Sequence, residues 1–168
     1  MATFMKTHCI KREQTLSADL EQAWRFFSDP TNLRLITPPW LDFTITSPVP
    51  ETIYPGLILT YRIRPLAGVP VTWVSEITHV RAPHYFVDEQ RLGPYRFWHH
   101  QHHLTAAGAE VKVADIVHYR LPLGLIGVLA HRLLLQSRLD EIFRFRYHAL
   151  ARHFQNPSPN DARDRRSI

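Results

Sequence analysis

Cysteine is almost absent from this sequence of 168 residues, which contains only Cys9. One cysteine forms no internal disulfide and offers no metal-site spacing, as is typical of proteins in a reducing compartment. The N-terminal residues Lys6, His8, Lys11 and Arg12 stand where a signal peptide has an apolar run. We therefore expect a cytoplasmic protein that is not exported.

A long hydrophobic run is also lacking. The most apolar stretch, residues 121–135, contains Pro122, His131 and Arg132, and it is shorter than the roughly 20 residues of a membrane-spanning helix. The net charge of +5 is not gathered in a compact run of Lys and Arg, and part of it comes from residues 161–166. These features argue against stable membrane insertion and against a nucleic-acid partner.

Glycine is sparse, at six residues. None of them forms a glycine-rich phosphate loop or the elbow that presents a nucleophilic serine. Ser75, Ser137 and Cys9 lack the local context of an activated nucleophile. The sequence therefore contains no motif that identifies an enzyme by itself.

What the sequence does contain is typical of a globular protein, since 45% of its residues are hydrophobic and 21% are charged. The length suits one domain, which we place at residues 1–154. Residues 155–168 contain two prolines and scattered charges, and we expect them to form a disordered tail.

Hydrophobic alternation predicts seven β-strands. A first strand over residues 3–15 precedes a short helix with Ser17 as its N-cap, and a further helical turn over residues 32–36 ends at Pro38. Six segments with a period of two follow, and the turns between them are too short for crossover helices, so consecutive strands should pair antiparallel. These segments are residues 43–46, 57–63, 71–77, 85–90, 96–102 and 111–119.

A long helix over about residues 125–154 ends the pattern. At about 100° per residue, apolar residues line one side of it, which is typical of a helix lying on a sheet. This stripe consists of Leu125, Val128, Leu135, Leu139, Phe143, Leu150 and Phe154. The fold class is therefore α+β.

Several segments resemble one branch of the START-like, or Bet v 1-like (SRPBCC), superfamily, which includes polyketide cyclases. The most specific is the hairpin from Gly93-Pro94-Tyr95 to Trp98-His99-His100-Gln101-His102; the others are residues 86–90, 115–124 and 138–147. The resemblance implies a helix-grip fold, in which a curved seven-stranded antiparallel sheet wraps around a long C-terminal helix and two short helices follow the first strand. It also implies an internal cavity, but no particular substrate.

Two strands carry polar residues on a face that is otherwise apolar. Alternation places His100 and His102 with Trp98 and Leu104, and it groups Asp115 and Tyr119 with Val113 and Val117 on the adjoining strand. If these faces coincide, the polar residues form a buried hydrogen-bonded network, orient a ligand, or perform acid–base catalysis. For catalysis the candidates are His100, His102 and Asp115.

Arg146 lies inside the apolar stripe of the long helix, and Arg132 falls on the same side. A buried guanidinium requires an acceptor. Asp115, Asp88 or Glu76 could supply one in an ion pair, the side chain could reach solvent, or a ligand carboxylate or phosphate could bind there.

His100 and His102 could share a metal ion, but a catalytic zinc site needs a third ligand, for which only Asp115 or another histidine is available on this face. We therefore expect no metal and no cofactor.

The leading hypothesis is a binding or carrier protein for a small lipophilic molecule, such as a lipid, isoprenoid, quinone or polyketide-like compound. The expected ligand contacts are Trp98, His100, His102, Asp115, Tyr119, Leu139, Phe143 and Arg146. One alternative is an enzyme like the polyketide cyclases, with the histidines as acid and base. Another is a non-catalytic interaction module acting through residues 125–135, a segment that would also suit a homodimer.

Overall fold

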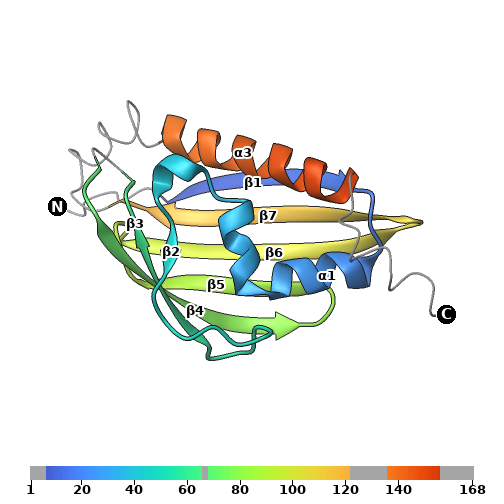
Figure 1. Cartoon of the computed structure of the whole chain (residues 1–168), viewed down its shortest axis with the longest axis horizontal. Helices are drawn as coiled ribbons and strands as arrows, with labels where there is room; N and C mark the ends of the chain where they lie inside the picture. The colour runs from blue at the N-terminus through green and yellow to red at the C-terminus, as the bar shows by residue number, and fades with distance from the viewer. Residues whose placement is uncertain (1–6, 66–67, 122–135, 156–168) are drawn as a thin grey trace.

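A computed structural model of the chain describes residues 7–65, 68–121 and 136–155. Its centre is one antiparallel sheet of seven strands in the order β1-β7-β6-β5-β4-β3-β2. The first strand pairs with the last, so the meander from β2 to β7 is joined by β1 at one edge (Figure 1). The strands are β1 (His8–Leu16), β2 (Thr44–Ile45), β3 (Ile58–Ile63), β4 (Val71–Arg81), β5 (Tyr85–Leu92), β6 (Phe97–Ala107) and β7 (Glu110–Arg120).

The helices pack on one face of this sheet. They are α1 (Leu20–Ser28), the short 3₁₀ helices η1 (Pro30–Leu35) and η2 (Pro39–Leu41), and the long α3 (Gln136–Gln155). α1 contacts β6 and β7, and α3 contacts β1. The two α-helices also meet directly, because the rings of Phe26 and Phe154 lie 5.3 Å apart. The seven strands and the long C-terminal helix over them confirm the predicted α+β architecture (Figure 1).

The inner face of the sheet is set by the two-residue period of its strands. Along β6, Trp98, His100, His102 and Leu104 are buried while the residues between them are more exposed. Along β7 the same holds for Val113, Asp115, Val117 and Tyr119. The face predicted for these two strands is therefore the one that the helices cover.

The start of α1 differs from the prediction. Its N-cap is Asp19, not Ser17: the Asp19 carboxylate accepts a hydrogen bond from the backbone N–H of Gln22 (2.7 Å), and the Gln22 side chain accepts one from the backbone N–H of Asp19 (3.2 Å). This reciprocal capping box uses the spacing of three residues between Asp19 and Gln22. β1 runs on to Leu16, so Ser17 lies in the bend that joins strand and helix.

Other boundaries shift by a few residues. The predicted turn over residues 32–36 is the 3₁₀ helix η1, and a second one begins at Pro39, where the sequence analysis expected only a stop. β6 continues to Ala107, five residues beyond its predicted end, because it stays paired with β7 as far as Glu110. The expected start of the long helix, the segment 125–135 and the tail after residue 155 lie outside the described residues.

In the described part, α3 buries Leu139, Phe143, Arg146, Ala149 and Leu150. Leu139, Phe143 and Leu150 belong to the predicted stripe, and Arg146 is buried among them, as expected. None of the helices within the described residues has the length and hydropathy needed to cross a bilayer.

Candidate ligand-binding site

A cavity of about 410 Å³ lies between the inner face of the sheet and the helices. Its wall is mostly apolar, with contributions from Phe27 in α1, Tyr61 in β3, Ile77 in β4, Trp98 in β6 and Phe143 in α3. Asp88, His100, His102 and Arg146 form one polar region of this wall, which also contains the polar residues Asp29, Asn32, Thr37 and Ser75. The cavity is in the size range of sites for small organic molecules.

Strand register brings the polar residues together. Asp88 on β5 is directly opposite His100 on β6, and His102 on β6 is directly opposite Asp115 on β7. Directly opposed residues of an antiparallel pair have neighbouring side chains, and residues two positions away are within reach of long side chains. Four polar side chains from three adjacent strands therefore form one cluster.

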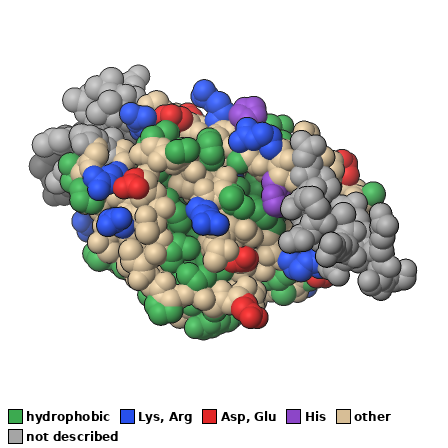
Figure 2. Space-filling model, viewed as in Figure 1, with side chains coloured by type: hydrophobic (Ala, Val, Ile, Leu, Met, Phe, Trp, Pro, Cys, Tyr) green, Lys and Arg blue, Asp and Glu red, His purple; other side chains and the backbone are tan. Residues whose placement is uncertain are grey.

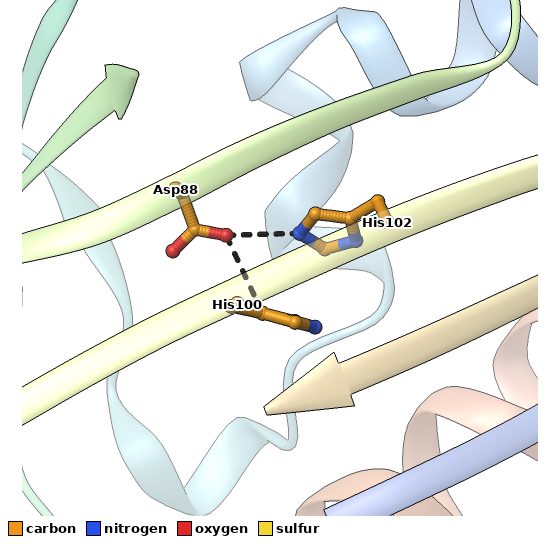
Figure 3. Close-up of side chains that lie close together, drawn as sticks. All are labelled: Asp88, His100 and His102. Atoms are coloured by element: carbon orange, nitrogen blue, oxygen red, sulfur yellow. Dashed lines mark hydrogen bonds and ion pairs between the residues drawn. The ribbon is translucent and has the colours of Figure 1, made fainter. Parts of the chain in front are cut away.

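The two histidines lie between the two carboxylates. On one side, Oδ2 of Asp88 lies 2.9 Å from Nε2 of His102 and 3.4 Å from Nδ1 of His100 (Figure 3). On the other side, Oδ1 of Asp115 lies 2.9 Å from Nδ1 of His102 and 3.2 Å from Nε2 of His100. Each imidazole thus faces a carboxylate through both ring nitrogens. Such contacts fix the ring orientation of both histidines.

Arg146 closes the cluster from α3. Its Nη2 donates a hydrogen bond to Oδ1 of Asp115 (3.0 Å), and its Nε lies 3.0 Å from Oδ2 of the same carboxylate without the alignment of a hydrogen bond. Nη2 also lies 3.3 Å from Nδ1 of His102 with the geometry of a hydrogen bond, and the same ring nitrogen lies 2.9 Å from Oδ1 of Asp115. Asp115 is therefore the ion-pair partner of Arg146, one of the three that the sequence left open.

Burial and charge separate the pKa values of the two histidines. Burial acts to lower the pKa of His102, but its contacts with Asp115 and Asp88 outweigh this and raise the pKa above its usual value. Burial lowers the pKa of His100, and the nearby His102 lowers it further. His102 is therefore favoured as the cation and His100 as the neutral imidazole.

The pKa values of the two carboxylates are lowered, whereas burial alone would raise them. Although burial acts to raise the pKa of Asp115, Arg146 and the two histidines hold it well below its usual range. For Asp88 too, burial is outweighed by the histidines and Arg146, which lower the pKa. Two anions are then balanced by protonated His102 and Arg146, so the cluster as a whole is close to neutral.

Aromatic side chains surround the cluster and keep it apart from bulk water. The ring of Phe86 stacks on His102 at 4.1 Å between centroids, and Trp98 and Phe143 each meet His100 edge to face at 6.1 Å. The two carboxylates beside His100 are largely buried: the side chain of Asp88 is 18% exposed and that of Asp115 is 8% exposed. The exposed part of Asp88 belongs to the cavity wall.

Solved structures show which fold this is. The Zhui aromatase/cyclase from Streptomyces sp. R1128 superposes with a TM-score of 0.69 at 15% identity, over 92% of this chain and 99% of that one. Norcoclaurine synthase from Thalictrum flavum gives 0.62 at 15% identity, over 89% and 97%. A major latex-like protein from Panax ginseng gives 0.61 at 9% identity, over 89% and 99%. The chain has the helix-grip fold that these proteins share.

No protein-family model matches the sequence, and no curated protein matches it either. The agreement with helix-grip proteins is therefore one of fold, because identities of 9–15% do not carry a shared substrate or reaction.

Six of the eight residues expected to contact a ligand line the helix-grip cavity. They are Trp98, His100, His102, Leu139, Phe143 and Arg146. Asp115 lies behind the histidines and is not part of the wall, and Tyr119 packs instead against His8, Tyr95 and Trp98. Asp115 and Tyr119 therefore do not line the cavity.

Asp88 is the site residue that the sequence analysis did not assign to the site. The sequence indicates Asp88 as a possible partner for Arg146, but it does not establish which face of β5 carries this residue. The signal was present in the alternation of that strand, since Phe86 is apolar and buried and Asp88 follows it by two residues. Glu76, another considered partner, lies 2.6 Å from Arg91 and does not belong to the cluster.

Asp88, His100 and His102 are also the described residues whose arrangement suits a metal ion, with one ligand atom from each lying within 4.8 Å of the others. A third candidate ligand therefore lies on β5, where the sequence offered only Asp115 or another histidine.

Proposed function

We propose that the protein binds a small lipophilic molecule in the helix-grip cavity, with the polar end of the ligand at the Asp88–His100–His102 wall. The observation that supports this most directly is the cavity itself, about 410 Å³ of mostly apolar space with a cluster of charged and ionisable groups on one part of its wall. A ligand with an apolar body and one oxygen-bearing end matches this distribution. Lipids, isoprenoids, quinones and polyketide-like compounds meet this description.

The pairing of Arg146 argues against the ligand carboxylate or phosphate that the sequence offered as one of its partners. Its guanidinium is already paired with Asp115, and the cluster is close to neutral. A ligand carboxylate or phosphate would have to displace Asp115, at the cost of leaving that carboxylate buried without its cation. The site therefore suits a hydroxyl, carbonyl or phenol better than a strong acid.

The test is native mass spectrometry of the purified full chain, followed by solvent extraction and identification of any bound molecule. The extracted protein is then titrated with a fluorescent lipophile, for the wild type and two neighbouring variants. Trp98→Ala removes an aromatic ring from the cavity wall and should weaken lipophile binding at least tenfold. Phe97→Ala is the control, because Phe97 is 42% exposed on the outer face of the sheet, and it should leave the affinity unchanged. Equal affinities of all three proteins, or no saturable binding, would refute the proposal.

A second function is favoured by the histidines. A neutral His100 beside a protonated His102 places a base and an acid on the same cavity wall, as proton transfer requires. The Zhui protein is named an aromatase/cyclase, so polyketide-like compounds are the first to assay. Turnover by the wild type that is lost in His100→Gln, with lipophile binding retained, would assign an enzyme; binding without turnover would assign a carrier.

A further inference from the structure

The two histidines present their remaining nitrogens to the same point on the cavity wall. His100 and His102 each direct one ring nitrogen towards Asp115, at 3.2 Å and 2.9 Å. A neutral histidine that donates its N–H to Asp115 has its lone pair on the other nitrogen. For His100 this is Nδ1 and for His102 it is Nε2, and both face Oδ2 of Asp88 (Figure 3). Two lone pairs and a carboxylate oxygen then converge, and either a proton on His102 or a metal ion can satisfy them.

We propose that Asp88, His100 and His102 form a binding site for a divalent first-row transition-metal ion, with Asp115 as the carboxylate that orients both imidazoles. Two histidines and one carboxylate are a donor set that binds catalytic zinc and non-haem iron(II). This site goes beyond the proposed function, since metal binding does not require a bound lipophile.

The two distances from Asp88 to the histidine nitrogens fit such an ion. With metal–ligand bonds of about 2.0–2.1 Å, neighbouring ligands of a tetrahedral or octahedral ion lie about 3–3.4 Å apart. The distances from Oδ2 of Asp88 are 2.9 Å to Nε2 of His102 and 3.4 Å to Nδ1 of His100. All three ligand atoms lie within 4.8 Å of one another.

The surroundings of the ligands also match a metal site. A histidine ligand usually donates its second N–H to a carboxylate, which fixes its tautomer and raises its basicity. Here one carboxylate, Asp115, lies 3.2 Å from His100 and 2.9 Å from His102, where it can accept from both, and it is itself held by Arg146. Phe86 and Phe143 pack on the imidazole rings and limit their rotation.

Arg146 decides on which side of the histidines the ion binds. Its Nη2 lies 3.0 Å from Asp115 and 3.3 Å from His102, so the Asp115 side is already occupied by a cation. The Asp88 side belongs to the cavity wall. The remaining coordination positions therefore open to the cavity, where water or a ligand oxygen can reach them.

Charge indicates what would occupy such an open position. A bound divalent ion replaces the proton on His102, and together with Arg146 it exceeds the charge of the two carboxylates by one. An anionic oxygen, such as hydroxide, phenolate or enolate, would restore neutrality. The ligand class implied at the metal is thus an ionisable oxygen compound.

The test uses full-length protein without a metal-affinity tag, first stripped with a chelator and then titrated with Zn²⁺ by calorimetry. We expect one Zn²⁺ per chain for the wild type. Asp88→Asn, which keeps the shape of the side chain, and His102→Gln should each weaken binding at least tenfold. His99→Gln is the matched control, because His99 lies on the same strand and 2.9 Å from a carboxylate of Glu89 on the outer face.

Two further measurements distinguish the loss of a metal ligand from misfolding of a variant. Circular dichroism establishes that each variant is folded, and the visible absorption of bound Co²⁺ should change in Asp88→Asn but not in His99→Gln. Absence of saturable Zn²⁺ binding to the wild type would overturn the proposal and leave a network held by protons alone. Binding that His99→Gln weakens as much as His102→Gln would overturn it as well. Neither result bears on the lipophile titration, which is carried out on metal-free protein.

Discussion

Asp115 is the residue on which the polar cluster depends. Its oxygens lie within 3.2 Å of Arg146 and of both histidines, and its side chain is 8% exposed. A buried anion of this kind is stable only with its cations in place, and the same is true of the cations. Asp115 therefore acts as a counter-ion and positioning residue, while Asp88 and the histidines form the surface that a ligand meets.

Replacing Asp115 with Asn should destabilise the fold by about 3–5 kcal/mol, since it leaves Arg146 buried without a counter-ion. The measurement is urea unfolding of chelator-treated protein at pH 7. Asp140→Asn is the matched control: Asp140 pairs with Arg12 at 2.6 Å, but both side chains are more than a third exposed. Loss of this pair should cost less than about 1 kcal/mol, and similar losses for the two variants would contradict the counter-ion role.

The pH dependence of stability tests whether the loss in Asp115→Asn is caused by the missing charge. The pKa of Asp115 in the folded protein lies below its value in the unfolded chain. Its contribution to stability is therefore fully present above the unfolded pKa of about 3.9 and is lost as the pH falls through the folded pKa. The stability difference between wild type and Asp115→Asn should narrow below about pH 4. A difference that stays constant there would point to disturbed packing.

At the scale of single elements, α1 shows how a short helix is held over the cavity. It has nine residues, a length at which helices in isolation are unstable. Its stability comes from the capping box of Asp19 and Gln22 and from Phe26 and Phe27, which line the cavity. The cap therefore fixes the position at which this part of the cavity wall begins.

Asp19→Ala should cost about 1 kcal/mol, because it leaves the N–H of Gln22 without its acceptor. Ser17→Ala, two residues earlier and exposed, should change stability by less than about 0.5 kcal/mol. The free energy of unfolding of the two variants, measured in guanidinium chloride, shows which residue is the N-cap of α1. A larger loss for Ser17→Ala would restore the N-cap that the sequence pattern suggested.

Alternation along single strands was enough to predict the elements and the inner face of β6 and β7. It could not predict which residues of neighbouring strands are opposite each other, because register depends on turns and on irregularities such as those in β4 between Ile77 and His79. For this reason His100 and His102 were identified from the sequence but Asp88 was not placed beside them. The same limit applied to Arg146, whose partner on the sheet follows only from the tertiary structure.

At the scale of the whole molecule, the sheet and helices enclose more space than their side chains fill. Phe26, Phe27, Trp73, Trp98 and Phe143 are all at the wall, yet about 410 Å³ remain. These aromatic side chains therefore do not close the cavity. On the face drawn in Figure 2, Lys and Arg are interspersed with Asp and Glu, so no single charge dominates the surface there. The cavity, and not a charged face, is thus the feature on which function is proposed to depend.

Filling the cavity should therefore remove lipophile binding without unfolding the protein. Ile77 on β4 is 4% exposed and lines the cavity, so Ile77→Trp places a large ring in the open space. Because that space exists, the cost should fall at or below the lower end of the about 1–3 kcal/mol typical of overpacked cores. We expect at least a tenfold weaker affinity for the fluorescent lipophile. Ile58→Trp, on the neighbouring strand and 46% exposed, is the control that should bind as the wild type does. Unchanged binding by Ile77→Trp would show that the lipophile occupies a different surface.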